Sequence, residues 1–293
     1  MSHRSQVQNP FVGLRPFESE DSLYYFGRGE QIKALLRQLH QTRFLAVVGS
    51  SGCGKSSLVR AGLIPNLEAG FLVQDRDLWH IATMKPGDAP QRNLARALLT
   101  VLAEPTKKET LETFTETIRR RGAQAVLEKI LPALDKRDAN LLLLVDQFEE
   151  LFRFQQESSD SGQEEAADFV SILLRLVEQA EAPIFICLTM RADFLGDCDA
   201  FQGLPEAVNR SQYLVPRLTR QQRCEAVASP IHLAGAKIAP RLLDRLLNEN
   251  VGTRDDLPIL QHALMRTWTQ WTGEDHGPIY MVHYDKIHTV KMR

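Results

Sequence analysis

Eight consecutive residues, 49–56, constrain this chain more than any other stretch of its sequence. They read Gly-Ser-Ser-Gly-Cys-Gly-Lys-Ser and match the pattern G-x-x-x-x-G-K-S/T at every fixed position. Glycines let a tight loop turn several backbone N–H groups toward one anion, and the lysine then reaches the terminal phosphates of a nucleotide. The motif therefore predicts a buried strand, a phosphate-binding loop and a helix, in that order.

The residues on both sides of the motif support this prediction. Residues 44–48 form a short apolar run typical of a buried strand, and residues 57–63 have the pattern of a helix. Phosphates would then lie at a helix N-terminus, where free N–H groups and the helix dipole favour anions. We expect Ser56 to bind Mg²⁺. The predicted nucleotide contacts are Gly49, Ser50, Ser51, Gly52, Cys53, Gly54, Lys55, Ser56 and Ser57.

Composition and charge limit the kinds of protein and partner that are compatible with this sequence. The 293 residues are 43% hydrophobic with a formal net charge of −2, which predicts an ordinary globular core and makes a nucleic-acid partner unsupported. The three arginines at 119–121 are expected to be a solvated helix end. The four cysteines show no metal-ligand or disulfide spacing. Because no apolar run approaches the roughly 20 residues of a membrane span and no signal peptide is present, we expect a cytoplasmic protein without a membrane partner.

Strand and helix patterns alternate along most of the chain. Their order predicts an α/β fold: a P-loop NTPase domain with a mostly parallel five-stranded sheet flanked by helices. From residue 219 onward the pattern is helical only, which predicts a small all-helical lid domain. The predicted strands are residues 44–48, 78–84, 141–145, 184–189 and 213–215. The predicted domains are a lead segment packed on the NTPase core (residues 1–29), the NTPase domain (30–216), the lid (217–275) and the truncated start of a further region (276–293).

Two other patterns bear on the architecture. Residues 155–165 are rich in Ser, Gln and Glu and are expected to form an exposed connector. No internal repeat is visible, which excludes a propeller or a solenoid within this chain.

A carboxylate follows the most apolar of the predicted strands. Asp146 ends the run at 141–145, where a P-loop NTPase holds its metal, and we expect it to bind Mg²⁺ through water; the alternative is an acidic strand end without a ligand. Gln147 comes next and can position water but cannot accept its proton. If a helical turn follows, residues three and four further on return to the face of Asp146, so we prefer Glu149 as the catalytic carboxylate. The alternative is that Glu150 takes this role, or that one glutamate caps the turn and the other is solvated.

Two arginines are candidates for nucleotide sensing. Arg191 follows the predicted strand at 184–189, at a sheet end that faces the ligand crevice in folds of this kind. Its guanidinium is suited to a γ-phosphate, and the alternative is a salt bridge to Asp193 or Glu149. Arg28 lies just before the first predicted helix and is expected near the base or ribose.

Taken together, these motifs resemble the novel STAND NTPases, which are related to the NACHT and NB-ARC switch ATPases. The resemblance covers most of the chain, from residue 9 to about residue 290. The segments that carry it are NPFVGLRPF at 9–17, YFGR at 25–28, the phosphate loop continuing into SLVRAGLIP at 57–65, VDQFEELF at 145–152, RADFL at 191–195 and LPILQHAL at 257–264.

The resemblance implies a nucleotide-operated switch, in which ADP holds a closed form and exchange for ATP permits oligomerisation. It matches Arg191 to the sensor arginine and Arg28 to the segment over the base. Pro258 stands where a lid proline of related proteins contacts the nucleotide. The fused effector and sensor repeats of the family are not seen, and His288 replaces an expected glycine, so the regulatory arms are expected to be absent.

The resulting hypothesis is a magnesium-dependent ATP/ADP-binding switch that hydrolyses ATP slowly and acts in signalling or defence. Its expected partners are other proteins or further copies of itself. One alternative is a nucleotide-binding interaction module that does not hydrolyse, because Gln147 follows the aspartate. A DNA-associated ATPase is a second alternative, which the near-neutral charge disfavours.

Overall fold

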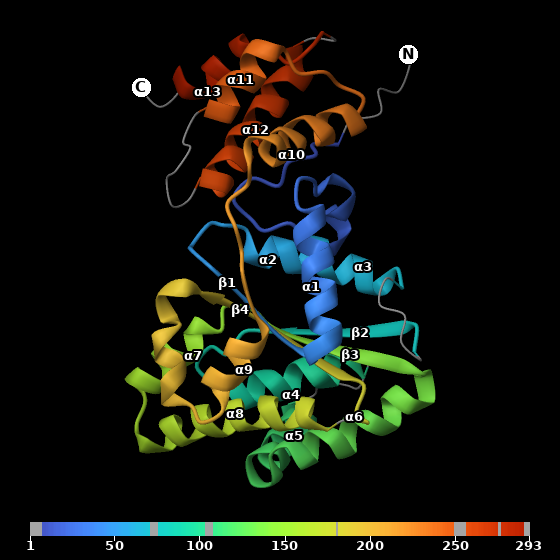
Figure 1. The fold of residues 1–293 in the computed structure, drawn as a ribbon, viewed down its shortest axis with the longest axis vertical. Coiled ribbons are helices and arrows are strands. Elements are labelled where there is room, and N and C mark those ends of the chain that lie inside the picture. Colours follow the sequence, from blue (N-terminus) through green and yellow to red (C-terminus); the bar gives the residue numbers. More distant parts are fainter. Residues whose placement is uncertain are drawn as a thin grey trace. The chain divides into compact units, whose positions relative to one another are not determined.

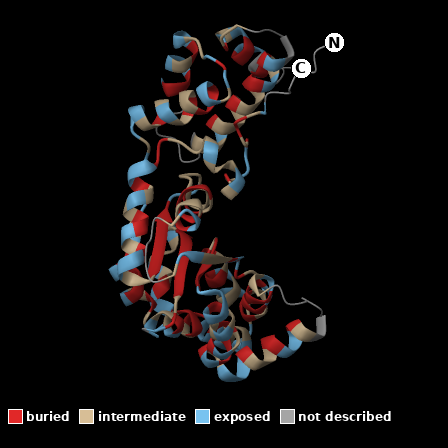
Figure 2. Ribbon diagram, turned by 90° about the vertical axis from the view of Figure 1, so that its right-hand side faces the viewer, coloured by how far each residue is buried: buried red, intermediate tan, exposed pale blue. Residues whose placement is uncertain are grey.

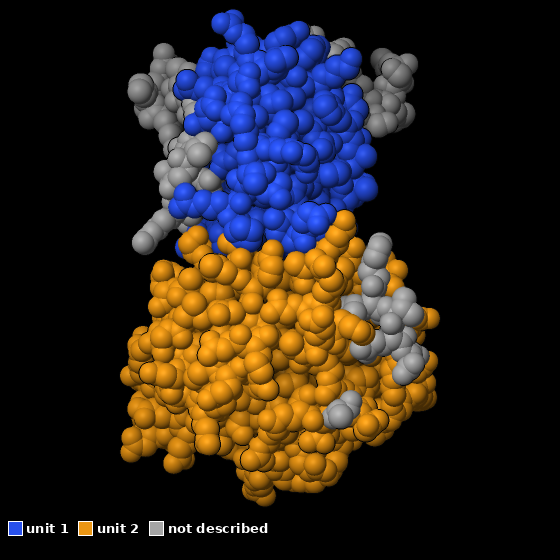
Figure 3. All heavy atoms as spheres, viewed as in Figure 1, with its two compact units in different colours: residues 1–32, 51–65, 216–293 blue, residues 33–50, 66–215 orange. Residues whose placement is uncertain are grey.

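The computed structural model describes residues 8–70, 76–102, 108–179, 181–248, 256–274 and 277–289. These residues form two compact units (Figure 3). Unit 1 combines Met1–Ile32, Ser51–Pro65 and Pro216–Arg293, and unit 2 combines Lys33–Ser50 and Asn66–Val215. The chain therefore crosses between the units several times, once inside helix α1 (Gly29–Thr42) and once inside the phosphate loop.

Unit 2 contains a parallel sheet of five strands in the order β2-β3-β4-β1-β5. Figure 1 labels β1, β2, β3 and β4. The sheet confirms the predicted α/β fold and all five predicted strands. Their bounds are β1 Phe44–Gly49, β2 Leu78–Met84, β3 Ala139–Val145, β4 Ile184–Arg191 and β5 Gln212–Leu214.

The central strands are continuous apolar runs because both faces of the sheet are covered. Every residue of β1 and β3 is buried, as the red strands of Figure 2 show. The core on one face of the sheet comes from amphipathic helices of the same unit, and Leu94 and Leu98 of α4 are fully buried in it. The helices of unit 2 are α4 Pro90–Val101, α5 Lys108–Arg121, α6 Ala123–Arg137, α7 Glu149–Glu157, α8 Asp160–Glu178 and α9 Leu204–Ser211.

The prediction of an exposed connector at 155–165 is wrong. Helix α7 continues to Glu157 and α8 begins at Asp160, so only Ser158 and Ser159 separate the two helices. Ser159 has the extended backbone of an N-cap, and Asp160 places a negative charge in the first turn, where the helix dipole favours it. Glu and Gln are good helix formers, so a polar stretch without apolar periodicity can still be helical.

Unit 1 contains the helices that follow β5. Phe11, in the lead segment, is buried in the core of these helices, with its ring edge-on to Trp268. The Asn9 side-chain amide donates to the Met265 carbonyl at 3.0 Å and fixes the same segment. The elements of unit 1 after β5 are α10 Arg220–Leu233, α11 Pro240–Asn248, α12 Asp256–Glu274 and α13 Met281–Thr289; the last of these was not predicted as a helix.

Three further predictions from the sequence can be compared with the structure. Arg119, Arg120 and Arg121 end α5 with side chains that are half exposed or more, as predicted for a solvated helix end. All four cysteines are unpaired thiols, in accord with their spacing. Within the described ranges, no helix is both long enough and apolar enough to cross a membrane.

Candidate functional site

The phosphate loop starts at the carboxyl edge of the sheet. Gly49 is the last residue of β1 and lies opposite Arg191 at the end of β4. Two central strands therefore deliver the start of the loop and the candidate sensor arginine to one edge of unit 2. This is the edge at which parallel α/β folds bind their ligands.

The rest of the loop, in unit 1, has the backbone that its glycines permit. Gly52 and Gly54 have φ values of 69° and 91°, in the left-handed region that other residues avoid. The helical segment then begins with α2 (Lys55–Ser57) and continues through the π-helical turn η2 (Leu58–Leu63) into α3 (Ile64–Glu68). Its first N–H groups belong to Lys55 and Ser56, as the motif predicts for an anion site.

Arg28 binds this loop rather than projecting away from the protein. Its side chain is only 3% exposed, and its guanidinium donates to the Cys53 carbonyl at 3.0 Å and to the Pro216 carbonyl at 2.7 Å. Gly27, with φ 83°, allows the chain to come close to α10, because a Cβ there would lie 2.3 Å from the Gln222 carbonyl oxygen. Arg28 thus ties the phosphate loop to the segment that leads into the helices of unit 1, and its expected contact with a base or ribose stays a prediction.

The first turn of α12 also reaches the loop. A Cβ on Gly54 would lie 3.7 Å from a terminal methyl group of Leu257, which is an ordinary van der Waals distance. The next residue is Pro258, the predicted lid proline, and it is partly exposed. The Leu-Pro segment therefore belongs to the surroundings of the loop, and contact between Pro258 and a nucleotide stays a prediction.

In unit 2, Asp146 lies directly after β3 and is 3% exposed. The Thr189 hydroxyl, on the neighbouring strand β4, donates to its Oδ1 at 2.5 Å and accepts the Gln147 N–H at 2.9 Å. Gln147 itself has a φ of 57°, an uncommon value for a residue other than glycine. Thr189 thus fixes both the carboxylate and the turn behind it, and it was not identified from the sequence.

The two candidate glutamates have different environments at this edge. Glu149 is 7% exposed, and its Oε2 accepts the Arg191 N–H at 3.3 Å. Glu150 turns toward the segment after β2, where its Oε2 accepts the Gly87 N–H at 3.2 Å. Because Thr189 and Arg191 are two residues apart on β4, Asp146 and Glu149 both bind the same end of that strand. Glu149 is therefore the glutamate that lies beside the metal-binding candidate.

Arg191 forms the ion pair that the sequence offered as an alternative to nucleotide sensing. Its guanidinium lies 2.6 Å from Asp193 and stacks 5.7 Å from the centre of the Phe194 ring. The side chain remains 34% exposed. A role in sensing the γ-phosphate stays a prediction.

Lys85 is a second residue that the sequence analysis missed. It follows β2 directly, and its ammonium donates to the Gln147 side-chain oxygen. Asp146 was predicted because it follows a strand of the parallel sheet, and Lys85 follows such a strand too. The carboxyl ends of parallel strands share one edge, so the same reasoning would have identified Lys85.

The two predicted metal ligands carry the kind of oxygen donor that Mg²⁺ prefers. Ser56 offers a hydroxyl and Asp146 a carboxylate, which are hard oxygen donors. Among the described residues there is no group of three or more His, Cys, Asp or Glu side chains that could hold a metal. Mg²⁺ in nucleotide sites takes only one or two protein ligands and completes its shell with phosphates and water.

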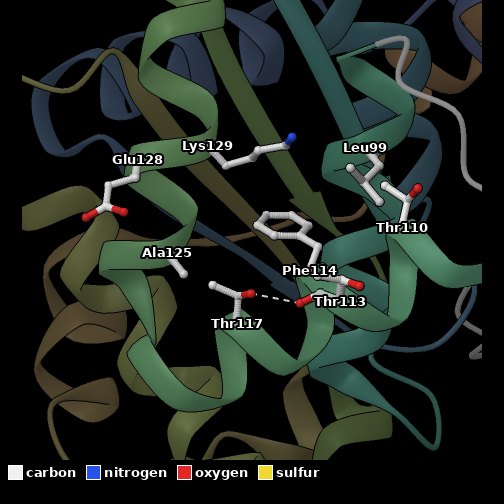
Figure 4. A pocket seen from close by; sticks show the side chains of 8 residues that line it. All are labelled: Leu99, Thr110, Thr113, Phe114, Thr117, Ala125, Glu128 and Lys129. Atoms are coloured by element: carbon white, nitrogen blue, oxygen red, sulfur yellow. Dashed lines mark hydrogen bonds between the residues drawn. The ribbon is translucent and has the colours of Figure 1, made fainter.

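A pocket lies elsewhere in unit 2. It has a volume of about 580 Å³ among α4, α5 and α6, and none of the predicted site residues lines it (Figure 4). Several of its polar groups have partners within the chain: the Thr117 hydroxyl donates to the Thr113 carbonyl, and Glu128 binds Arg121 and Gln124. We assign this pocket no role.

A parallel sheet in this strand order, with a phosphate loop after β1 and an aspartate after β3, defines a P-loop NTPase. The chain belongs to the novel STAND NTPase 1 family, whose model matches residues 10–292. Membership of this family implies nucleotide binding. A search of curated proteins found no match.

Solved structures support the fold. A chain of the HORMA:CdnC:Trip13 complex of E. coli MS115-1 is 13% identical and has a TM-score of 0.58, covering 96% of this chain and 94% of that one. The ADP form of the ORC2 protein of Aeropyrum pernix is 14% identical with a TM-score of 0.61, over 97% and 71%. A Walker-type ATPase of Pyrococcus abyssi is 14% identical with a TM-score of 0.51, over 95% and 76%. At these identities the similarity shows the fold alone.

Proposed function

We propose that this protein binds ATP and ADP with Mg²⁺, hydrolyses ATP slowly, and uses the bound nucleotide to switch the arrangement of its helical region. The observation that carries the proposal is the Arg28 side chain, which bonds the Cys53 carbonyl in the phosphate loop and the Pro216 carbonyl before α10. A nucleotide that reshapes the loop would act on these bonds. The switch would serve signalling or defence in the cytoplasm, through other proteins or further copies of this chain.

The residues divide into roles by their chemistry. Lys55 and the loop N–H groups would hold phosphates, and Ser56 and Asp146 would hold the metal. Glu149 would accept a proton from the attacking water, and Arg191 would report the γ-phosphate. When bound, Mg²⁺ would neutralise charge that develops on the phosphates.

Nucleotide binding and phosphate release test this proposal on wild type, Lys55→Ala and Glu149→Gln. We expect Lys55→Ala to lose nucleotide affinity, and Glu149→Gln to bind normally but release no phosphate. Wild-type affinity in Lys55→Ala would overturn the central claim. Native mass with ADP and with a non-hydrolysable ATP analogue tests the switch, which an unchanged mass in both states would oppose.

A nucleotide-binding module without hydrolysis is the second candidate. The observation that favours it is Gln147, which follows Asp146 in a left-handed turn and accepts a hydrogen bond from Lys85. A neutral amide cannot accept a proton from water. Wild-type phosphate release at background, together with tight nucleotide binding, would favour this candidate.

A further inference from the structure

The outer strand β2 leaves one long edge of the sheet uncovered by another strand. β2 has seven residues, and within the described part of the chain it pairs only with β3. The opposite edge strand, β5, has only three. Long edge strands are usually protected by an internal charge, a proline or a bulge. β2 reads LWHIATM, which contains none of these protecting residues, and its first residue, Leu78, is 58% exposed.

The register of β2 shows which backbone groups face outward. The Met84 carbonyl accepts the Asp146 N–H, so the even-numbered residues of β2 bond toward β3. In a parallel pair, the N–H and C=O groups of alternate residues point to opposite sides. Trp79, Ile81 and Thr83 therefore direct their backbone groups to the open edge.

Space is present beside this edge. A groove of about 360 Å³ runs between β2 and α4. Its lining includes Ile81, Thr83 and Lys85 on the strand side and Asn93 and Arg96 on the helix side. An additional strand at this edge would lie along the groove, as in the known cases of β-strand addition.

The residues that flank β2 make this edge complementary to itself. Ile81 is the middle residue, and the exposed residues Asp77 and Lys85 lie four positions before and after it. If two copies of β2 pair antiparallel with Ile81 opposite Ile81, Asp77 of each copy lies opposite Lys85 of the other. Trp79 then lies opposite Thr83 of the second copy, on the same face. Directly opposite residues of an antiparallel pair lie about 4.5–5.5 Å apart at Cβ, which suits both pairs.

We propose that β2 pairs with β2 of a second copy of this chain, antiparallel and in register at Ile81, to form a two-fold symmetric dimer. The three outward residues of each copy would form about six backbone hydrogen bonds across the interface. Two Asp77–Lys85 ion pairs close its ends. A second copy fits better than an unrelated strand because one register matches the charges at both ends, as a two-fold interface requires.

The contact between Lys85 and Gln147 is compatible with this dimer. An ammonium group has three donors, so Lys85 can bind Gln147 of its own chain and Asp77 of the second copy together. The interface therefore adjoins the residue that follows Asp146. The pairing of two β2 strands does not require a nucleotide, so it can be tested independently of the proposed function.

Sedimentation equilibrium of the full chain over a range of concentrations tests the proposal, with Asp77→Lys, Lys85→Asp and the double variant. We expect wild type to form a dimer of twice 33.2 kDa. Each single variant places like charges opposite each other at both ends and weakens the dimer at least about tenfold. The double variant exchanges the charges and restores wild-type association.

Two further variants control for unrelated effects. Glu206→Lys makes the same charge change as Asp77→Lys at an exposed position of α9 and leaves the dimer intact. Thr83→Pro removes an outward N–H without touching the β2–β3 ladder, and it abolishes the dimer while the thermal unfolding transition is retained. A wild-type monomer at high micromolar concentration, single variants that dimerise normally, or a double variant without rescue would each overturn the proposal.

Discussion

The phosphate loop in unit 1 and the carboxyl edge of the sheet in unit 2 are held in different ways. Positive-φ glycines shape the loop, and Arg28 fixes it by bonding backbone carbonyls from two distant segments. At the sheet edge, by contrast, side chains bond to one another and to neighbouring strands, as Thr189 does with Asp146. The backbone conformation therefore determines the shape of the phosphate loop, whereas side-chain contacts determine the arrangement at the sheet edge.

This contrast leads to different expectations for substitutions. A change in the loop region should lower nucleotide affinity or stability, because it alters a backbone shape. A change of the predicted general base Glu149, at the sheet edge, should lower the rate of hydrolysis and leave nucleotide binding in place, because it would remove the group that accepts a proton from water. Measurements that fail to separate binding from hydrolysis in this way would contradict the division.

The largest expected effect is that of Glu149→Gln on hydrolysis. Loss of a general base lowers a rate by about 10²–10⁴-fold, whereas the glutamine oxygen can still accept the Arg191 N–H and preserve the local fold. We therefore expect phosphate release to fall to background and ADP affinity to stay unchanged. Glu150→Gln is the matched control, because Glu150 binds Gly87 instead. An equal loss of rate in that control would transfer the role to Glu150.

The five parallel strands were predictable from the sequence, and the side-chain contacts at the carboxyl edge of the sheet were not. Apolar runs ending in Asp146 and Arg191 indicate a parallel sheet whose carboxyl ends meet, and the structure has them at that edge. Thr189 was not predicted as a site residue, because a threonine inside an apolar strand does not indicate its hydrogen-bond partner. The strand register is needed to show which neighbouring residue its hydroxyl faces. The connector at 155–165 was mispredicted because polar residues form a helix when one face packs on a core.

Arg28→Met should have the next largest effect, on stability. The substitution leaves the Cys53 and Pro216 carbonyls without their charged donor at a site that is 3% exposed. Each lost bond to a charged group costs about 1.5–3 kcal/mol, so we expect the loss of both to lower the free energy of unfolding by about 3–6 kcal/mol. Arg28→Lys should recover part of this loss, since an ammonium lacks the planar fork that reaches both carbonyls.

Denaturant unfolding measures the stability of the Arg28 variants, and ADP titration of the folded variants measures their nucleotide affinity. If Arg28 positions the loop, Arg28→Lys should also bind ADP more weakly than wild type. Unchanged stability and affinity in Arg28→Met would show that the two carbonyl bonds do not hold the loop.

Lys55→Ala should reduce nucleotide affinity without unfolding the protein. Charge-assisted hydrogen bonds to phosphate contribute about 1.5–3 kcal/mol, which corresponds to about 10–100-fold in the dissociation constant. Calorimetric titration with ADP and Mg²⁺ measures this change. Lys136→Ala, at an exposed position of α6, is the matched control and should bind as wild type does.

Arg191→Ala should have the smallest effect on stability and the most selective effect on ligand preference. Its ion pair with Asp193 joins two partly exposed side chains, and such pairs contribute about 1 kcal/mol or less. If Arg191 senses the γ-phosphate, the variant should lose affinity for a non-hydrolysable ATP analogue while its ADP affinity is retained. Asp193→Ala sharpens this test, because it removes the carboxylate that pairs with Arg191 and should strengthen binding of the analogue. Equal losses for both nucleotides in Arg191→Ala would indicate instead that Arg191 shapes the edge through its contacts with Asp193 and Phe194.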